Sequence, residues 1–77
     1  MTKQQAEFTK HYDIDSIEYR FKFFNEMSYL YRDIDGINNR QRFLDLLIAN
    51  IELHSPLTGR NYTRVVNAMK ANAESLK

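Results

Sequence analysis

Apolar residues recur at helical spacing through most of this 77-residue chain, and this periodicity restricts the fold more than any other feature. The cleanest repeat lies over residues 58–75, where Thr58 has a side chain suited to an N-cap and Leu57 precedes it. The pattern predicts a helix with one apolar and one polar side. The inward positions are Tyr62, Val65, Val66, Met69, Ala73 and Leu76. The outward positions are Arg60, Arg64, Asn67, Lys70 and Glu74.

Two patterns compete over residues 15–33. Apolar and polar residues alternate at positions 17–23, which is typical of a strand. Over the longer window a helical stripe accommodates more residues, and Asp15 with Glu18 has the spacing of a capping box. We therefore predict a helix over residues 15–33 that ends near Gly36. Its stripe comprises Tyr19, Phe23, Met27, Leu30 and Ile34, with Ile17, Phe24 and Tyr31 beside it.

A third helix is predicted over residues 38–53. Asn38 or Asn39 is a suitable N-cap, and Ser55 with Pro56 ends the segment. The inward stripe consists of Phe43, Leu44, Leu47, Ile48 and Ile51. Gln41, Asp45 and Glu52 face away from it.

The first residues leave two interpretations open. Thr2 and Gln5 resemble a capping box, and Phe8 and Tyr12 would share one face of a helix. A short helix over residues 2–12 and a frayed arm are both consistent with this pattern. The predicted fold is therefore all-α: a single small domain, residues 1–77, in which three main helices form a compact bundle joined by short loops.

Catalytic chemistry is not expected from this composition. The absence of cysteine excludes a disulfide framework and a thiolate zinc site, and His11 and His54 lie far apart in sequence. The segment "DIDG" at residues 33–36 begins like a calcium loop, but the positions that should supply later ligands hold unsuitable residues. Gly36 and Gly59 are isolated, so no glycine-rich phosphate loop exists. We expect no enzyme activity, no cofactor, no metal site and no small-molecule substrate.

The distribution of apolar residues also bears on location. No segment approaches the ~18 consecutive apolar residues of a membrane span, and the first residues lack the apolar run of a signal peptide. We expect a cytoplasmic protein without a membrane partner.

Basic residues are concentrated in the second half of the chain. Residues 1–36 carry five Lys and Arg against seven Asp and Glu, whereas residues 37–77 carry six against three. A DNA- or RNA-binding regulator of the helix-turn-helix type is one hypothesis, with helix 58–75 in the groove. The whole chain has a net charge of only +1, which counts against this class. The candidate surface for nucleic acid or an acidic partner comprises Arg40, Arg42, Arg60, Arg64, Asn67 and Lys70.

Three large side chains fall outside the predicted stripes and favour a different function. Tyr29 lies on the polar side of its helix, and Leu46 and Leu53 lie off the main stripe of theirs. Such residues are candidates for a protein interface or a homodimer seam. The leading hypothesis is a small non-enzymatic adaptor, inhibitor or regulator that binds another protein, of the kind common among bacterial and phage accessory proteins. No motif ties the chain to a particular family.

Overall fold

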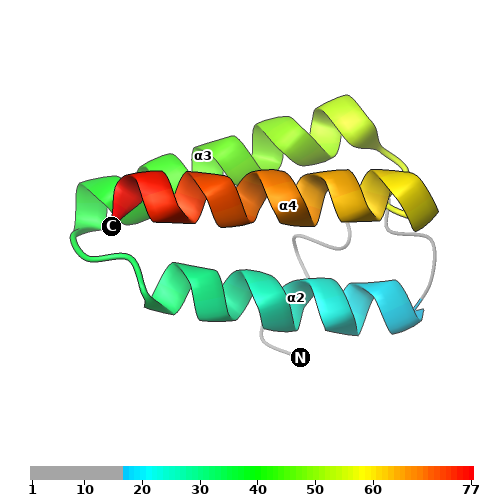
Figure 1. The fold of residues 1–77 in the computed structure, drawn as a ribbon, viewed down its shortest axis with the longest axis horizontal. Coiled ribbons are helices and arrows are strands. Elements are labelled where there is room, and N and C mark those ends of the chain that lie inside the picture. The colour runs from blue at the N-terminus through cyan, green and yellow to red at the C-terminus, as the bar shows by residue number, and fades with distance from the viewer. Residues whose placement is uncertain (1–16) are drawn as a thin grey trace.

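The computed structural model describes residues 17–77, and within this range the chain forms three α-helices and no strand (Figure 1). This confirms the predicted all-α bundle of three main helices, with every described helix end within two residues of its predicted position. The predicted segment 2–12 and residues 15 and 16 lie outside the described residues. The helices are α2 (Ile17–Arg32), α3 (Ile37–His54) and α4 (Gly59–Leu76).

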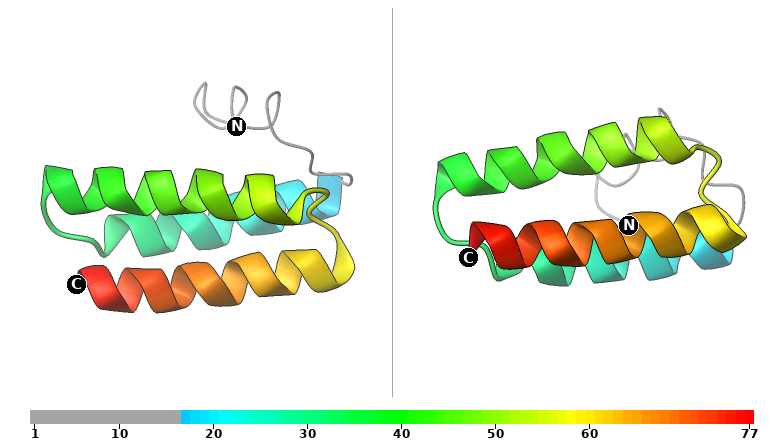
Figure 2. Two further views of the ribbon diagram at one scale, coloured as in Figure 1. Left: turned by 90° about the horizontal axis from the view of Figure 1, so that it is seen from above. Right: turned by 45° about the horizontal axis from the view of Figure 1, so that its top comes forward.

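Helix α4 is the helix on which the other two pack. Loops of four residues separate α2 from α3 and α3 from α4, so consecutive helices run in opposite directions. Figure 1 shows α4 lying alongside α3, and the view from above in Figure 2 shows α2 behind the two, so that the three helices form a triangular bundle. Contacts between helices are concentrated between α4 and α3 and between α4 and α2. One side of α3 is therefore left without a covering helix among residues 17–77.

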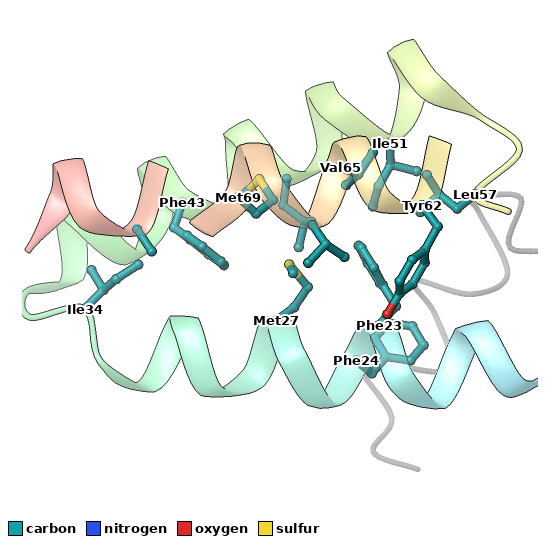
Figure 3. Close-up of a cluster of buried hydrophobic side chains, with 13 residues drawn as sticks. Phe23, Phe24, Met27, Ile34, Phe43, Ile51, Leu57, Tyr62, Val65 and Met69 are labelled. Carbon is teal, nitrogen blue, oxygen red and sulfur yellow. The ribbon is translucent and has the colours of Figure 1, made fainter. Parts of the chain in front are cut away.

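The core is built from residues of the predicted stripes, of which Ile34 lies in the first loop, together with Leu57 from the second loop (Figure 3). Ile34 and Leu57 are completely buried although they lie outside the helices. Each turns an apolar side chain inward, so that the loop is held against the bundle by burial of that side chain, worth about 1.5–3 kcal/mol. The buried residues are Phe23, Phe24, Met27, Ile34, Phe43, Leu47, Ile51, Leu57, Tyr62, Val65, Val66, Met69 and Ala73.

The start of α3 differs from the predicted N-cap. Gly36, not Asn38 or Asn39, occupies the N-cap position, with a φ of 89° that favours glycine. Its carbonyl oxygen accepts the first helical hydrogen bond from the Arg40 N–H at 3.0 Å. Asn39 already lies inside the first turn, where its amide donates to the carbonyl oxygens of Asp35 (3.3 Å) and Leu76 (3.4 Å). The prediction failed because an Asn near a helix start can serve neighbouring carbonyls as well as cap.

Two further local predictions need correction. Thr58 occupies the N-cap position of α4, but its side chain makes no capping hydrogen bond. Its carbonyl oxygen instead accepts the backbone N–H groups of Asn61 and Tyr62 at 3.1 and 3.5 Å. Ile17, expected beside the inward stripe, is the first residue of α2 and is exposed.

Candidate functional site

Two of the six residues predicted for a nucleic-acid or acidic-partner surface are engaged within the bundle. The Arg40 Nε donates to the Ile34 carbonyl oxygen at 2.9 Å, and its guanidinium lies 5.4 Å from the centre of the Tyr31 ring. Arg40 thus fastens the loop between α2 and α3 to both helices. The Lys70 Nζ lies 3.9 Å from the Glu26 Oε2, which pairs α4 with α2. Both cations have a structural role that the sequence did not reveal.

The remaining four residues are exposed but do not form one surface. Arg60, Arg64 and Asn67 share the outer side of α4, since they lie within about 60° of one another around the helix. Arg42 belongs to the first half of α3, which lies beside the last turns of α4, because the nearby Asn39 reaches the Leu76 carbonyl oxygen. Arg42 is therefore near the end of the α3–α4 pair opposite to Arg60. The structure does not join the six residues into a continuous basic strip.

The geometry of α3 and α4 also differs from a helix-turn-helix. In that motif the two helices cross at a steep angle, which frees the second helix to enter a groove. Here α4 runs back alongside α3 over most of its length (Figure 1). One side of α4 is consequently committed to packing against α3, and another side to packing against α2.

The three residues predicted for a protein interface lie on two separate surfaces. Tyr29 is 63% exposed on α2, where the Arg32 guanidinium lies 5.4 Å from the centre of its ring. Leu46 and Leu53 are 38% and 76% exposed on α3. These leucines are seven residues apart, which places them on one line of the helix about 10 Å from each other. Only the leucines form a common patch.

Contacts between asparagine side chains and α4 show where this patch lies. The Asn50 amide of α3 contacts the Met69 sulfur of α4 at 3.8 Å, and the Asn39 amide of α3 donates to the Leu76 carbonyl oxygen of α4 at 3.4 Å. Leu46 and Leu53 lie within about 60° of Asn50 around α3, on the side away from the buried stripe. They therefore border α4. With the antiparallel register set by these contacts, Leu53 is level with about residues 62–66 and Leu46 with about residues 69–73.

We define the α3–α4 face as the outer surface along this border. All its members are exposed, and helical phase places them on the same side of the two helices. Alanines lie between the larger side chains, so the backbones of both helices are accessible to close approach. The α3–α4 face comprises Arg42, Leu46, Ala49 and Leu53 of α3 with Arg64 and Ala71 of α4.

The sequence did not reveal two buried polar atoms at the border between α2 and α4. Tyr62 is 6% exposed, and its hydroxyl is buried without a hydrogen-bond partner, as is the Oε2 of Glu26. Figure 3 shows the Tyr62 ring reaching from α4 toward α2 beside Phe23. Burial raises the pKa of Tyr62 to about 12, with smaller contributions from the charges of Glu26 and Tyr19. Tyr62 accordingly retains its proton at neutral pH and acts through its ring, which packs 4.9 Å from that of Tyr19.

Within residues 17–77, no three His, Cys, Asp or Glu side chains gather as they would around a metal ion. None of the three helices α2, α3 and α4 combines the length and the apolar character that crossing a bilayer requires.

The α3–α4 face is therefore the surface on which a functional assignment rests. No protein-family model, curated protein or solved structure matches this chain.

Proposed function

We propose that this chain is a small non-enzymatic interaction protein that binds another protein through the α3–α4 face. The observation that carries the proposal is the exposure of Leu46 and Leu53 on one line of α3. Removing such side chains from water favours association, and clustered exposed apolar residues mark interaction surfaces. An adaptor, inhibitor or regulator of this size requires only one such face.

A DNA- or RNA-binding regulator is the alternative function. It is supported by the exposure of Arg60, Arg64 and Asn67 along the outer side of α4, where these residues would contact phosphates. Its support is weaker, because Arg40 and Lys70 are engaged within the bundle and α4 lies flat against α3. Leu46 and Leu53 would also have no apolar counterpart on a phosphate backbone.

Site-specific photo-crosslinking in the natural host tests the proposed function. A photoreactive amino acid replaces Ala49, which lies between the two leucines, and in a matched control it replaces the exposed Thr63 of α4. Thr63 lies about 100° around α4 from Arg64, outside the α3–α4 face. We expect a defined protein adduct from position 49 that is absent from position 63. Absence of an adduct at position 49, or the same adducts at both positions, would reject the proposal.

Titration with duplex DNA and single-stranded RNA at two salt concentrations separates the two functions. The alternative predicts binding at low salt that weakens steeply as salt rises and that is lost in Arg60→Ala/Arg64→Ala. The proposed function predicts no such binding. Salt-sensitive binding that depends on these two arginines would favour the nucleic-acid regulator and overturn the proposal.

A further inference from the structure

The charges around Leu46 and Leu53 restrict the chemistry of a partner for the α3–α4 face. Arg42 lies one helical turn before Leu46, and Arg64 is level with Leu53 on the neighbouring helix. Both arginines are exposed. Among residues 17–77 the ion pairs are Lys70 with Glu26 and Lys77 with Glu74, so neither arginine is neutralised by a described carboxylate. The leucine patch is thus flanked by one unpaired positive charge toward each end.

The acidic residues of α3 lie away from this face, and the acidic residue of α4 is engaged in an ion pair. Asp45 and Glu52 are about 100° around α3 from Leu46 and Leu53 respectively, on the flank opposite to α4. Glu74 of α4 is paired with Lys77, whose Nζ lies 3.1 Å from the Glu74 Oε1. The α3–α4 face is therefore apolar in its centre and positive at its edges, with no negative charge among its residues.

We propose that the α3–α4 face binds an acidic amphipathic helix of the partner protein. This inference rests on the proposed function and specifies the partner. A helix with apolar residues seven positions apart reproduces the spacing of about 10 Å between Leu46 and Leu53. Ala49 and Ala71 leave room for its backbone to approach. An acidic residue one turn beyond the apolar residue over Leu46 would meet Arg42, and an acidic residue level with the apolar residue over Leu53, on the flank toward α4, would meet Arg64. Such complementary charges fix the register of a docked helix.

The same charges disfavour the other occupants. Two copies of this chain joined through their α3–α4 faces would bring four arginines together without a carboxylate on either face, and like charges brought together at an interface are repulsive. A nucleic acid would match the arginines but not the leucines. An acidic helix is the occupant that satisfies both features at once.

Selection from a displayed library of 18-residue helices tests the inference. The library keeps an apolar pair seven positions apart and offers Asp, Glu, Lys, Arg and Gln with equal frequency at the flanking positions. We expect the recovered helices to be acidic at these positions and to lose binding to Leu46→Ser/Leu53→Ser. Recovery of neutral or basic helices, or of none above background, would overturn the inference.

Charge reversal supplies the matched controls. Arg42→Glu/Arg64→Glu should weaken binding of the selected acidic helices at least tenfold at low salt, and the same library should now yield basic helices. Lys22→Glu/Arg32→Glu changes the net charge equally but lies on α2, and it should leave binding within twofold. Equal loss in both double variants would show a non-specific charge effect and overturn the inference.

The outcomes for the two proposals can be distinguished. A protein adduct at position 49 together with non-acidic selected helices would refute the acidic partner while the protein-binding function stands. Loss of the adduct refutes the function itself. Binding of the wild-type protein to anionic phospholipid vesicles is measured in the same way. If it binds the vesicles as tightly as the selected helices, the α3–α4 face recognises a negatively charged lipid surface, and the inference of an acidic helix is overturned.

Discussion

Replacement of Tyr62 by phenylalanine should stabilise the protein. The Tyr62 hydroxyl is buried between α2 and α4 without a hydrogen-bond partner, while its ring packs against Tyr19 and Phe23 at centroid distances of 4.9 and 6.0 Å. Phenylalanine keeps the ring and removes only the hydroxyl. Because an unsatisfied buried polar group costs about 1–3 kcal/mol, we expect Tyr62→Phe to raise the free energy of unfolding at pH 7 by about 1 kcal/mol.

The same substitution should remove a loss of stability at alkaline pH. Below pH 10 the phenol is protonated in both the folded and the unfolded chain, so the fold bears no ionisation cost. The pKa of Tyr62 is about 12 in the folded protein against 10.0 as the ordinary value. Between pH 10 and pH 12 the unfolded state releases this proton and the folded state retains it, so stability falls with rising pH. The limit of this loss is about 2–3 kcal/mol, because each pKa unit corresponds to about 1.4 kcal/mol.

Urea denaturation followed by far-ultraviolet circular dichroism measures both effects. Wild type and Tyr62→Phe are compared at pH 7, 9, 10 and 11, and their difference cancels the titration of lysines common to both. Tyr29→Phe is the control, since Tyr29 is exposed. A destabilisation above about 1 kcal/mol in Tyr62→Phe at pH 7 would mean that the hydroxyl has a partner. If stability falls equally with rising pH in wild type and in Tyr62→Phe, ionisation of the Tyr62 hydroxyl is not the cause of the alkaline loss, and the reasoning from its raised pKa is refuted.

Three further substitutions probe the bundle. Phe43→Ala removes a completely buried ring and should lower the free energy of unfolding by about 3–5 kcal/mol. Thermal denaturation should then show that much of the protein is already unfolded at the start of heating. Gly36→Ala forces a side chain into a φ of 89° and should lower the urea midpoint by an amount equivalent to about 1–3 kcal/mol, although no atom obstructs the new Cβ. Lys70→Met breaks a partly exposed ion pair with Glu26 and should cost less than about 1 kcal/mol, with a smaller effect in 1 M salt.

The helices could be predicted because their information is local. A 3.6-residue repeat of apolar residues fixes both the type of element and its inward side, as the burial of Phe43, Leu47 and Ile51 shows. The cap of α3 could not be predicted, because Gly36 and the asparagines that follow it are all acceptable in a helix start. The choice depended on carbonyl groups supplied by the rest of the fold, including that of Leu76 at the far end of the chain.

The roles of the polar residues were less accessible to sequence reasoning. Helical phase places Lys70 outward but does not say that Glu26 of another helix lies beside it. The sequence groups Arg40 with the other basic residues of the second half of the chain but does not show the carbonyl oxygen of Ile34 within its reach. The same limit applies to Tyr62. Its ring was predicted in the core, but the sequence did not indicate that its buried hydroxyl would have no hydrogen-bond partner. A side chain's partner on another helix is determined by packing, which the periodicity of one segment does not contain.

The exposure of Leu46 and Leu53 follows from the way three helices share a core. Each helix of such a bundle can bury one stripe against its neighbours, and α3 buries Phe43, Leu47 and Ile51. A second apolar line on α3 would require a further element beside α4, and none occurs there among residues 17–77. The three described helices therefore gain no packing from leucine at these two positions, where a polar residue would serve solubility better. This mismatch between the needs of the fold and the residues present supports a partner at the α3–α4 face.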